Sequence, residues 1–241
     1  MKFKTFLAGC LGGLLSLNSC TNSPDMTDYA AYVNPFIGTG GHGHTFPGAI
    51  VPHGMISPSP DTRIDGWDAC SGYYYADSTI NGFSHTHLSG TGCCDYGDVL
   101  LMPTVGKQQY RTTDPQSQRL AYASSFSHKN EIAEPGYYSV FLDTYQVKAE
   151  ISSTKRGAIH RYTFPENAES GFIIDLDYSL QRQTNSEMEI EVISDTEICG
   201  HKKTTYWAFD QYINFYAKFS KPFSYTLVTD SITMDNGKRL P

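Results

Sequence analysis

Short runs in which apolar and polar residues alternate dominate the second half of the chain, and they restrict its fold more than any other feature. In the clearest run, Val147, Ala149 and Ile151 occupy alternate positions with polar residues between them. Side chains of a strand point alternately to its two faces, so this run predicts a half-buried β-strand. Further strands are expected at 138–142, 158–164, 172–176, 188–193 and 206–219, each bounded by turn residues. Such spacing, with no helix of normal length between the runs, predicts an all-β chain folded as an antiparallel β-sandwich.

The size and composition of the chain agree with one main domain. Of its 241 residues 39% are apolar, which is enough for one sizeable core but short for two well-formed domains. Residues 32–106 are rich in Gly, Pro, His and Tyr and show little periodicity, so we expect loops there. Loops on a rigid scaffold often carry the functional residues, and we therefore look for the site in this half.

The first residues have the composition of an export signal. Lys2 and Lys4 precede a short apolar stretch that ends at Cys20. The sequence LNSC resembles the lipobox of bacterial lipoproteins, which predicts a signal peptide at 1–19, a lipidated Cys20 and a polar tether at 20–31. The alternative is an ordinary cleaved signal with an incidental cysteine. On the first interpretation we expect a lipoprotein anchored in the bacterial cell envelope, with a folded domain at 32–241.

The net charge and the lengths of the apolar runs argue against nucleic acid as a partner and against a transmembrane helix. The net charge is −7, which makes nucleic acid a poor partner. No apolar run of membrane-spanning length follows residue 20, so the body of the chain has no predicted transmembrane helix. Four cysteines remain outside the signal, and their spacing does not choose among the disulfide pairings: Cys70, Cys93, Cys94 and Cys199.

Two His-x-His pairs, His42 with His44 and His85 with His87, are candidates for a functional site. Three interpretations stay open: a metal site, histidines that hydrogen-bond loop backbone, and a ligand-facing surface. A cupin-like metal site would need a glutamate shortly after the second pair, but the sequence there is LSGTG. Residues 38–43 also match G-x-G-x-x-G, yet no helical pattern follows, so we exclude a dinucleotide site.

A third segment, 59–92, favours a ligand-facing surface. It places Asp65, Trp67 and Asp68 ahead of three consecutive tyrosines. An exposed aromatic face beside fixed hydrogen-bonding groups suits a polyhydroxylated ring, whose C–H face stacks while its hydroxyl groups need directed partners. The competing interpretation is that Trp67 belongs to the core. Its neighbours Gly66 and Asp68 favour exposure in a pocket.

Several longer sequence segments together indicate one family. The chain contains VNPFIGTGGHGHTFPGAIVPHGM, SPDTR, GWDACSGYYYADSTINGFSHTHLSGTG, DYGDVLLMP, FSHKNEIAEPGYYSV, HRYTFP and FSKPF, in order from residue 33 to 223. With these words it resembles the N-terminal domain of glycoside hydrolase family 92, exported bacterial α-mannosidases that need calcium. The resemblance implies a supersandwich-like (galactose-mutarotase-like) β-sandwich packed on a larger helical barrel, with the active site between the two. It also implies inversion of configuration by a carboxyl pair.

For this chain the resemblance implies one wall of a mannose subsite. Trp67 matches the tryptophan that the domain contributes to that wall. The matching words also contain Asp65, Asp68, Gly41, His42, His44, His85 and His87, which we expect to face the sugar without binding metal. The catalytic carboxylates and the calcium ligands are expected in the helical domain, which lies outside this sequence, so the sandwich is expected to be catalytically inactive alone and incomplete at its C-terminal end. The main alternative is a noncatalytic glycan-binding envelope lipoprotein.

Overall fold

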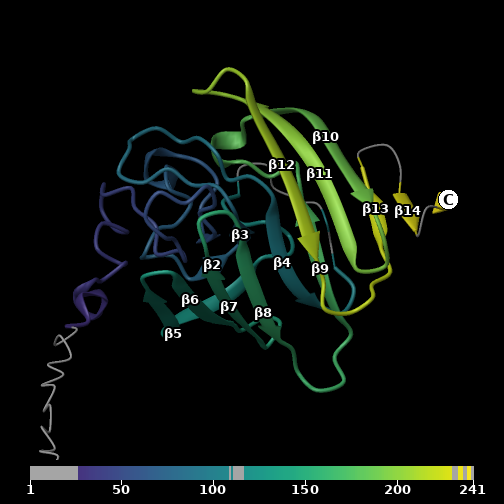
Figure 1. Ribbon diagram of the computed structural model, residues 1–241, viewed down its shortest axis with the longest axis horizontal. Coiled ribbons are helices and arrows are strands. Elements are labelled where there is room, and N and C mark those ends of the chain that lie inside the picture. Colours follow the sequence, from purple (N-terminus) through teal and green to yellow (C-terminus); the bar gives the residue numbers. More distant parts are fainter. Residues whose placement is uncertain (1–26, 109, 111–116, 230–232, 236–237, 240–241) are drawn as a thin grey trace, which may run out of the picture.

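The computed structural model describes residues 27–108, 110, 117–229, 233–235 and 238–239, which form an all-β structure (Figure 1). The signal peptide at 1–19 and Cys20 lie outside these residues, as does most of the tether. Every strand pairing recorded among the described residues is antiparallel. The prediction of an all-β, antiparallel sandwich is therefore confirmed.

Two larger sheets enclose the core. The five-stranded sheet has the order β2-β5-β6-β7-β8, and its strands are Thr79–Ile80 (β2), Ser124–Glu134 (β5), Tyr137–Leu142 (β6), Val147–Ser153 (β7) and Ala158–Thr163 (β8). The four-stranded sheet has the order β1-β3-β4-β9, from strands Ser59–Asp61 (β1), Gly82–Ser84 (β3), Leu100–Val105 (β4) and Ser170–Asp175 (β9). Rings from the two sheets meet, since Phe83 of β3 lies 6.3 Å from Tyr138 of β6 and 6.4 Å from Tyr162 of β8, centroid to centroid.

Two smaller sheets follow along the chain. One has the order β10-β11-β12, with strands Thr184–Val192 (β10), Glu197–Thr205 (β11) and Gln211–Lys218 (β12). In Figure 1 these long strands lie away from the five-stranded sheet. The other is formed by Thr226–Val228 (β13), Thr233–Asp235 (β14) and Lys238–Arg239 (β15).

The alternation in the sequence is the direct cause of the core. Val147, Ala149 and Ile151 of β7 are 0%, 0% and 1% exposed, and they pack with Val140 and Leu142 of β6. Burial of such side chains contributes about 1.5–3 kcal/mol each relative to exposure. The two inner faces thus provide the stable scaffold from which the loops of residues 32–99 extend.

One predicted strand needs correction. The expected strand at 206–219 begins only at Gln211, because residues 206–210 form the turn between β11 and β12, where the Tyr206 amide donates to the Ala208 carbonyl. Strands β1 to β4 lie in the segment 32–106, where we expected mainly loops, and β13 to β15 were not predicted. Strands β5 and β11 were also missed, because polar residues break their alternation. Lys202 occupies an inward position of β11 and is 0% exposed.

Helical structure among the described residues is limited to short 3-10 turns. These are Tyr29–Tyr32 (η1), Trp67–Ala69 (η2) and Leu180–Arg182 (η3). None of the helices in this part of the chain has the length and apolar character that crossing a membrane would require. The turn η2 matters most for function, because it carries Trp67.

Candidate functional site

Trp67 lies on the surface, at the start of η2, with 58% of its surface exposed. Gly66 precedes it with φ = 95°, a left-handed conformation that favours glycine and that directs the chain outward into the turn. The indole rests on Gly92, where a Cβ atom would come within 2.3 Å of the Trp67 Cη2. Gly92 therefore leaves room for the ring, and the opposite side of the indole remains open.

His44 lies edge-on to this indole. The ring centroids are 4.8 Å apart and the planes are inclined by 78°. His44 is 7% exposed, has φ = 52°, and its Nε2 has no hydrogen-bond partner in the described structure. Left-handed φ is uncommon for a residue other than glycine, and backbone strain of this kind clusters at binding and active sites.

His42 and Asp68 complete this surface. The His42 Nδ1 is 2.8 Å from Asp68 Oδ1, and the His42 side chain is 74% exposed. The loop of residues 38–45 is held against the neighbouring loop because the Gly90 amide donates to the His44 carbonyl at 2.6 Å. We call the group formed by Trp67, His42, His44 and Asp68 the Trp67 surface.

The Trp67 surface also contains the group of metal-ligand side chains found among the described residues. One atom from each of His42, His44 and Asp68 lies within 4.8 Å of the others. Two imidazoles and a carboxylate are a donor set for a transition metal. Calcium takes six to eight oxygen ligands, and this set offers too few, so the calcium implied by the resemblance does not fit these residues.

Gly41 and Asp65 flank the Trp67 surface. Gly41 is exposed, with φ = 56° and no atom within 4 Å of a built Cβ. Asp65 is half-buried, and its Oδ1 accepts a hydrogen bond from the Gly66 amide at 2.7 Å. It borders a hollow of about 360 Å³ on the side of η2, lined by Thr62, Arg63, Asp65, Ala76, Asp77, Ser78, Thr79, Gln118 and Arg119.

The hollow is polar and its charges are already paired in part. Arg63 makes a bidentate ion pair with Asp77, with N–O distances of 2.8–3.1 Å, and its guanidinium lies 3.9 Å from the centroid of the Tyr74 ring. The hydrogen bonds that Arg63 donates to Asp77 raise the pKa of Arg63, so this cation stays charged. The Arg63–Asp77 pair therefore contributes hydrogen-bonding groups to the hollow rather than a free charge.

His85 and His87 are not part of the Trp67 surface. β3 ends at Ser84, so the two rings do not share a strand face. His85 Nδ1 donates to the Val99 carbonyl at 2.6 Å, and His85 Nε2 is 3.2 Å from His160 Nε2. Burial lowers the pKa of both rings, that of His160 to about 3, so both are neutral.

The tautomers of this histidine pair follow from the contacts. His85 donates from Nδ1, so its Nε2 accepts from the His160 Nε2 proton. His160 Nδ1, 2.8 Å from the Tyr162 hydroxyl, then accepts the phenolic proton. The chain of hydrogen bonds ends at a backbone carbonyl, which makes the pair a structural element of the sandwich.

His87 is buried in a separate network. Its Nε2 lies 2.8 Å from Asp61 Oδ1 and 3.0 Å from Ser84 Oγ, and its Nδ1 lies 2.7 Å from the Ser57 carbonyl. Both the His87 and the Asp61 side chains are 0% exposed. Ser, His and Asp are thus together, but Ser84 and Asp61 contact the same ring nitrogen and no substrate can reach them. The proposal below rests on Trp67, His42, His44 and Asp68 instead.

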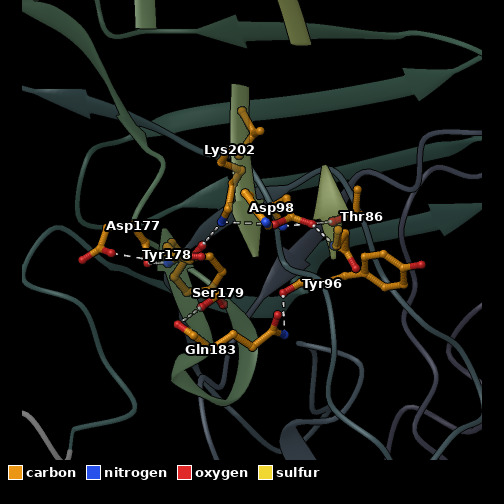
Figure 2. Close-up of polar contacts among 12 residues, drawn as sticks. Thr86, Tyr96, Asp98, Asp177, Tyr178, Ser179, Gln183 and Lys202 are labelled. Atoms are coloured by element: carbon orange, nitrogen blue, oxygen red, sulfur yellow. Dashed lines mark hydrogen bonds and ion pairs between the residues drawn. The ribbon is translucent and has the colours of Figure 1, made fainter. Parts of the chain in front are cut away.

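Sequence reasoning missed a buried ion pair that holds the β10-β11-β12 sheet to the loop before β4 (Figure 2). Lys202 Nζ lies 3.1 Å from Asp98 Oδ1 and donates to the Tyr178 carbonyl at 2.8 Å; both side chains are 0% exposed. Asp98 Oδ2 also accepts from Thr86 Oγ1 at 2.7 Å and from Gln211 Nε2 at 2.9 Å. Burial lowers the pKa of Lys202, while Asp98 opposes that change. The acidic residues in the segment DYGDVLLMP, which contains Asp98, were the feature of the sequence that could have indicated this ion pair.

The structure thus presents an exposed indole beside histidine and carboxylate groups on an all-β antiparallel scaffold. The comparisons identify the family of this scaffold. Residues 32–240 match the Glycosyl hydrolase family 92 N-terminal domain. The chain therefore belongs to glycosyl hydrolase family 92, as a form of its N-terminal domain.

Solved structures of this family resemble the chain closely. A family GH92 α-mannosidase from Bacteroides thetaiotaomicron, solved in complex with mannoimidazole, superimposes with a TM-score of 0.79 at 38% identity over 88% of this chain and 27% of its own. The GH92 family glycosyl hydrolase CcMan5 gives a TM-score of 0.63 at 30% identity over 78% of this chain and 26% of its own. The likeness covers most of this chain but about a quarter of theirs.

A curated relative is also similar to this chain in sequence over only part of its own length. An uncharacterized secreted glycosidase from Arthroderma benhamiae is 32% identical over 143 residues, which is 58% of this chain and 18% of that protein. This chain therefore spans only a minor part of the length of its relatives. Their activities belong to the longer proteins.

Proposed function

We propose that the Trp67 surface binds a mannose residue of an α-mannoside, as one wall of the sugar subsite of an α-mannosidase. The observation that carries the proposal is the exposed Trp67 indole with the exposed His42 ring and the Asp68 carboxylate on the same surface. The C–H face of a sugar stacks on an indole, and hydroxyl groups at the sugar's edge would hydrogen-bond to His42 and Asp68. The relative solved with mannoimidazole supports the choice of mannose.

We further propose that this chain alone does not hydrolyse α-mannosides. An inverting glycosidase needs a carboxylic acid and a carboxylate roughly 6.5–9.5 Å apart across the sugar. On the Trp67 surface Asp68 is bonded to His42, and the surface is open to water on one side. A carboxyl pair works best in an enclosed site that tunes its pKa values and positions the substrate. The second wall, in this proposal, comes from a helical-barrel domain that also holds calcium.

The location belongs to the same proposal. An export signal at 1–19 followed by a lipidated Cys20 would place the domain on the bacterial envelope membrane, where extracellular glycans are accessible. The secreted glycosidase from Arthroderma benhamiae supports a place outside the cytoplasm. Intact-mass analysis of the mature protein tests the anchor: an acylated Cys20 at the N-terminus is expected, and an unmodified start at another residue would contradict it.

The decisive experiment compares two exposed tryptophans. Trp67 and Trp207 are 58% and 62% exposed, so replacing either by Ala should leave the fold intact. The chain, mixed with a GH92 helical-barrel partner, should release mannose from an α-mannoside in the presence of calcium. Trp67→Ala should lower that rate at least tenfold, equivalent to about 1.4 kcal/mol, whereas Trp207→Ala should not.

Other outcomes separate the competing functions. Mannose release by the chain alone, surviving repurification, would show that the catalytic groups lie in this domain. Binding of α-mannosides that depends on Trp67, without activity with any barrel partner, would favour the noncatalytic glycan-binding lipoprotein. Equal loss in both tryptophan variants would remove the Trp67 surface as the sugar site.

A further inference from the structure

Three cysteines converge under the Trp67 surface. Cys70 follows η2 as its C-cap residue and is 2% exposed, and Cys94 is 4% exposed; both belong to the hydrophobic core. Cys93 is half-buried beside them. The fourth described cysteine, Cys199, lies on β11, where its thiol contacts Glu191. The structure describes all of them as free thiols.

The contacts of these sulfur atoms distinguish Cys94 from Cys93. Cys70 Sγ donates to the Trp67 carbonyl at 2.8 Å, and Cys94 Sγ reaches the preceding carbonyl, that of Gly66, at 3.8 Å. Cys70 also lies close enough to Cys94 to raise the pKa of the Cys94 thiol. Cys93 Sγ instead turns to the carbonyl of its own neighbour at 3.9 Å. Cys70 raises the pKa of the Cys93 thiol as well, but of these two described neighbours it is Cys94 that contacts a carbonyl of the same loop as Cys70.

We infer that Cys70 and Cys94 form a disulfide bond in the mature protein, which joins η2 covalently to the loop beneath the Trp67 indole. The inference concerns thiols that the proposed sugar site does not use, so it does not depend on that function. It is supported by the burial of both cysteines and by the contacts of their sulfur atoms with consecutive carbonyl groups of one loop.

The reaction needs an oxidant of the disulfide class. The Cys70 and Cys94 S–H bonds break, one S–S bond forms, and two protons pass to solvent. The two electrons reduce the disulfide of a thiol–disulfide oxidoreductase or of oxidised glutathione to two thiols. Such oxidants act outside the reducing cytoplasm, as in the bacterial periplasm.

The environment of Cys94 indicates when the bond forms. Burial raises the pKa of the Cys94 thiol, and the neighbouring Cys70 raises it further. Exchange proceeds through the thiolate, so the folded, reduced protein should oxidise slowly. Oxidation should be fast during folding, before the core closes over the sulfur atoms. For the same reason of access, the completed bond should resist reductants while the protein stays folded.

The expected effect is a more rigid support for Trp67. The bond would close the loop of residues 70–94, which contains β2 and β3, and would thereby reduce the conformational freedom of the unfolded chain. The midpoint of thermal unfolding should rise by roughly 5–10 °C in the oxidised protein and return after denaturation with a reductant. Gly92, which the indole contacts, lies two residues from one end of the bond.

Peptide mapping of the full chain tests the pairing. Residues 64–106 contain no Lys or Arg, so trypsin leaves all three cysteines on one peptide. Chymotrypsin cuts at the tyrosines 73–75 and at Phe83, which separates Cys70 from the adjacent pair. After refolding with oxidised glutathione, mass spectrometry without reductant should find a linked peptide two hydrogen atoms lighter than the sum of its parts.

Single substitutions identify the bonded sulfur atoms. The link should persist in Cys93→Ser and Cys199→Ser and should be lost in Cys70→Ser and Cys94→Ser. In the two variants that lose it, alkylation of the denatured protein should find two fewer protected cysteines. If Cys94→Ser does not fold, Cys93→Ser alone still decides, because its link can come only from Cys94. A Cys70–Cys93 link that survives in Cys94→Ser, or free thiols throughout after oxidative refolding, would overturn the inference.

Discussion

Gly92 lies directly against the Trp67 indole, so close that a methyl group there would overlap the ring, with the built Cβ 2.3 Å from Cη2 and 2.9 Å from Cζ3. The two residues come from different loops and meet only in the folded protein. Because the clash is with an exposed ring that can swing away, a substitution at Gly92 should alter the position of Trp67 more than the stability of the core.

Gly92→Ala should therefore displace the indole and weaken mannoside binding by about tenfold or more. The displacement can be measured in a Trp207→Phe background, where Trp67 is the remaining one of the chain's 2 tryptophans, as a change in emission maximum and in acrylamide quenching. Gly157→Ala is the matched control, because nothing lies within 4 Å of its Cβ. Unchanged Trp67 emission in Gly92→Ala would show that the loop yields instead of the ring.

The His85–His160 pair should make the fold sensitive to acid. Burial lowers the pKa of both histidines below the unfolded value of about 6.5, that of His160 to about 3. Their contribution to stability is therefore fully present above about pH 6.5 and is lost as the pH falls toward the folded pKa. Each neutral histidine should add about 1.4 kcal/mol per pH unit to that loss.

Urea unfolding between about pH 7 and pH 4 measures this slope. In His160→Gln the amide can donate to His85 and accept from Tyr162, so the network is kept while one titrating group is removed. The slope should decrease by about 1.4 kcal/mol per pH unit. An unchanged slope would mean that other groups cause the acid sensitivity.

The buried pair of Lys202 and Asp98 should be costly to break from one side. Lys202→Met leaves a buried carboxylate without its cation and should destabilise the fold by about 3–5 kcal/mol. Adding Asp98→Asn should recover part of that loss, because the amide carries no charge and its oxygen can still accept from Thr86. Lys218→Met is the control: its pair with Glu197 is exposed on the Lys218 side, and such pairs contribute about 0–1 kcal/mol. Denaturant titrations that find equal losses for Lys202→Met and Lys218→Met would contradict this role.

The protein should carry no tightly bound transition metal. His42 and His44 from one loop and Asp68 from η2 supply only three donors, His42 and Asp68 are already hydrogen-bonded, and structural zinc sites use four ligands. Elemental analysis of the purified chain should find well below one zinc, iron or manganese per chain, and a chelator should not shift thermal unfolding. About one metal per chain, lost in His42→Ala, would replace the sugar-facing interpretation of these residues by a metal site.

The sequence alone was sufficient for the strands whose burial is regular. In β7 the apolar residues Val147, Ala149 and Ile151 alternate with polar ones, so a local pattern predicts both the strand and its inner face. In β11 the inward position of Lys202 is polar, and its burial is stabilised by Asp98, a residue from a distant loop. No local pattern contains that partner, which is why the strand was missed.

The residues of the site likewise divide into those predicted from the sequence and those whose contacts only the structure decided. The sequence determined that an exposed indole, histidines and carboxylates would share the loop-rich half of the chain, and the family words named Trp67. Only the tertiary structure decided that His44 contacts Trp67, that His85 pairs with His160, and that His87 is buried on Asp61. The periodicity of side chains is a property of neighbouring residues and can be read along the chain. Contacts between loops join residues that are far apart in the sequence. Which of them meet depends on how the folded domain brings the loops together and on which buried polar groups then need a hydrogen-bond partner.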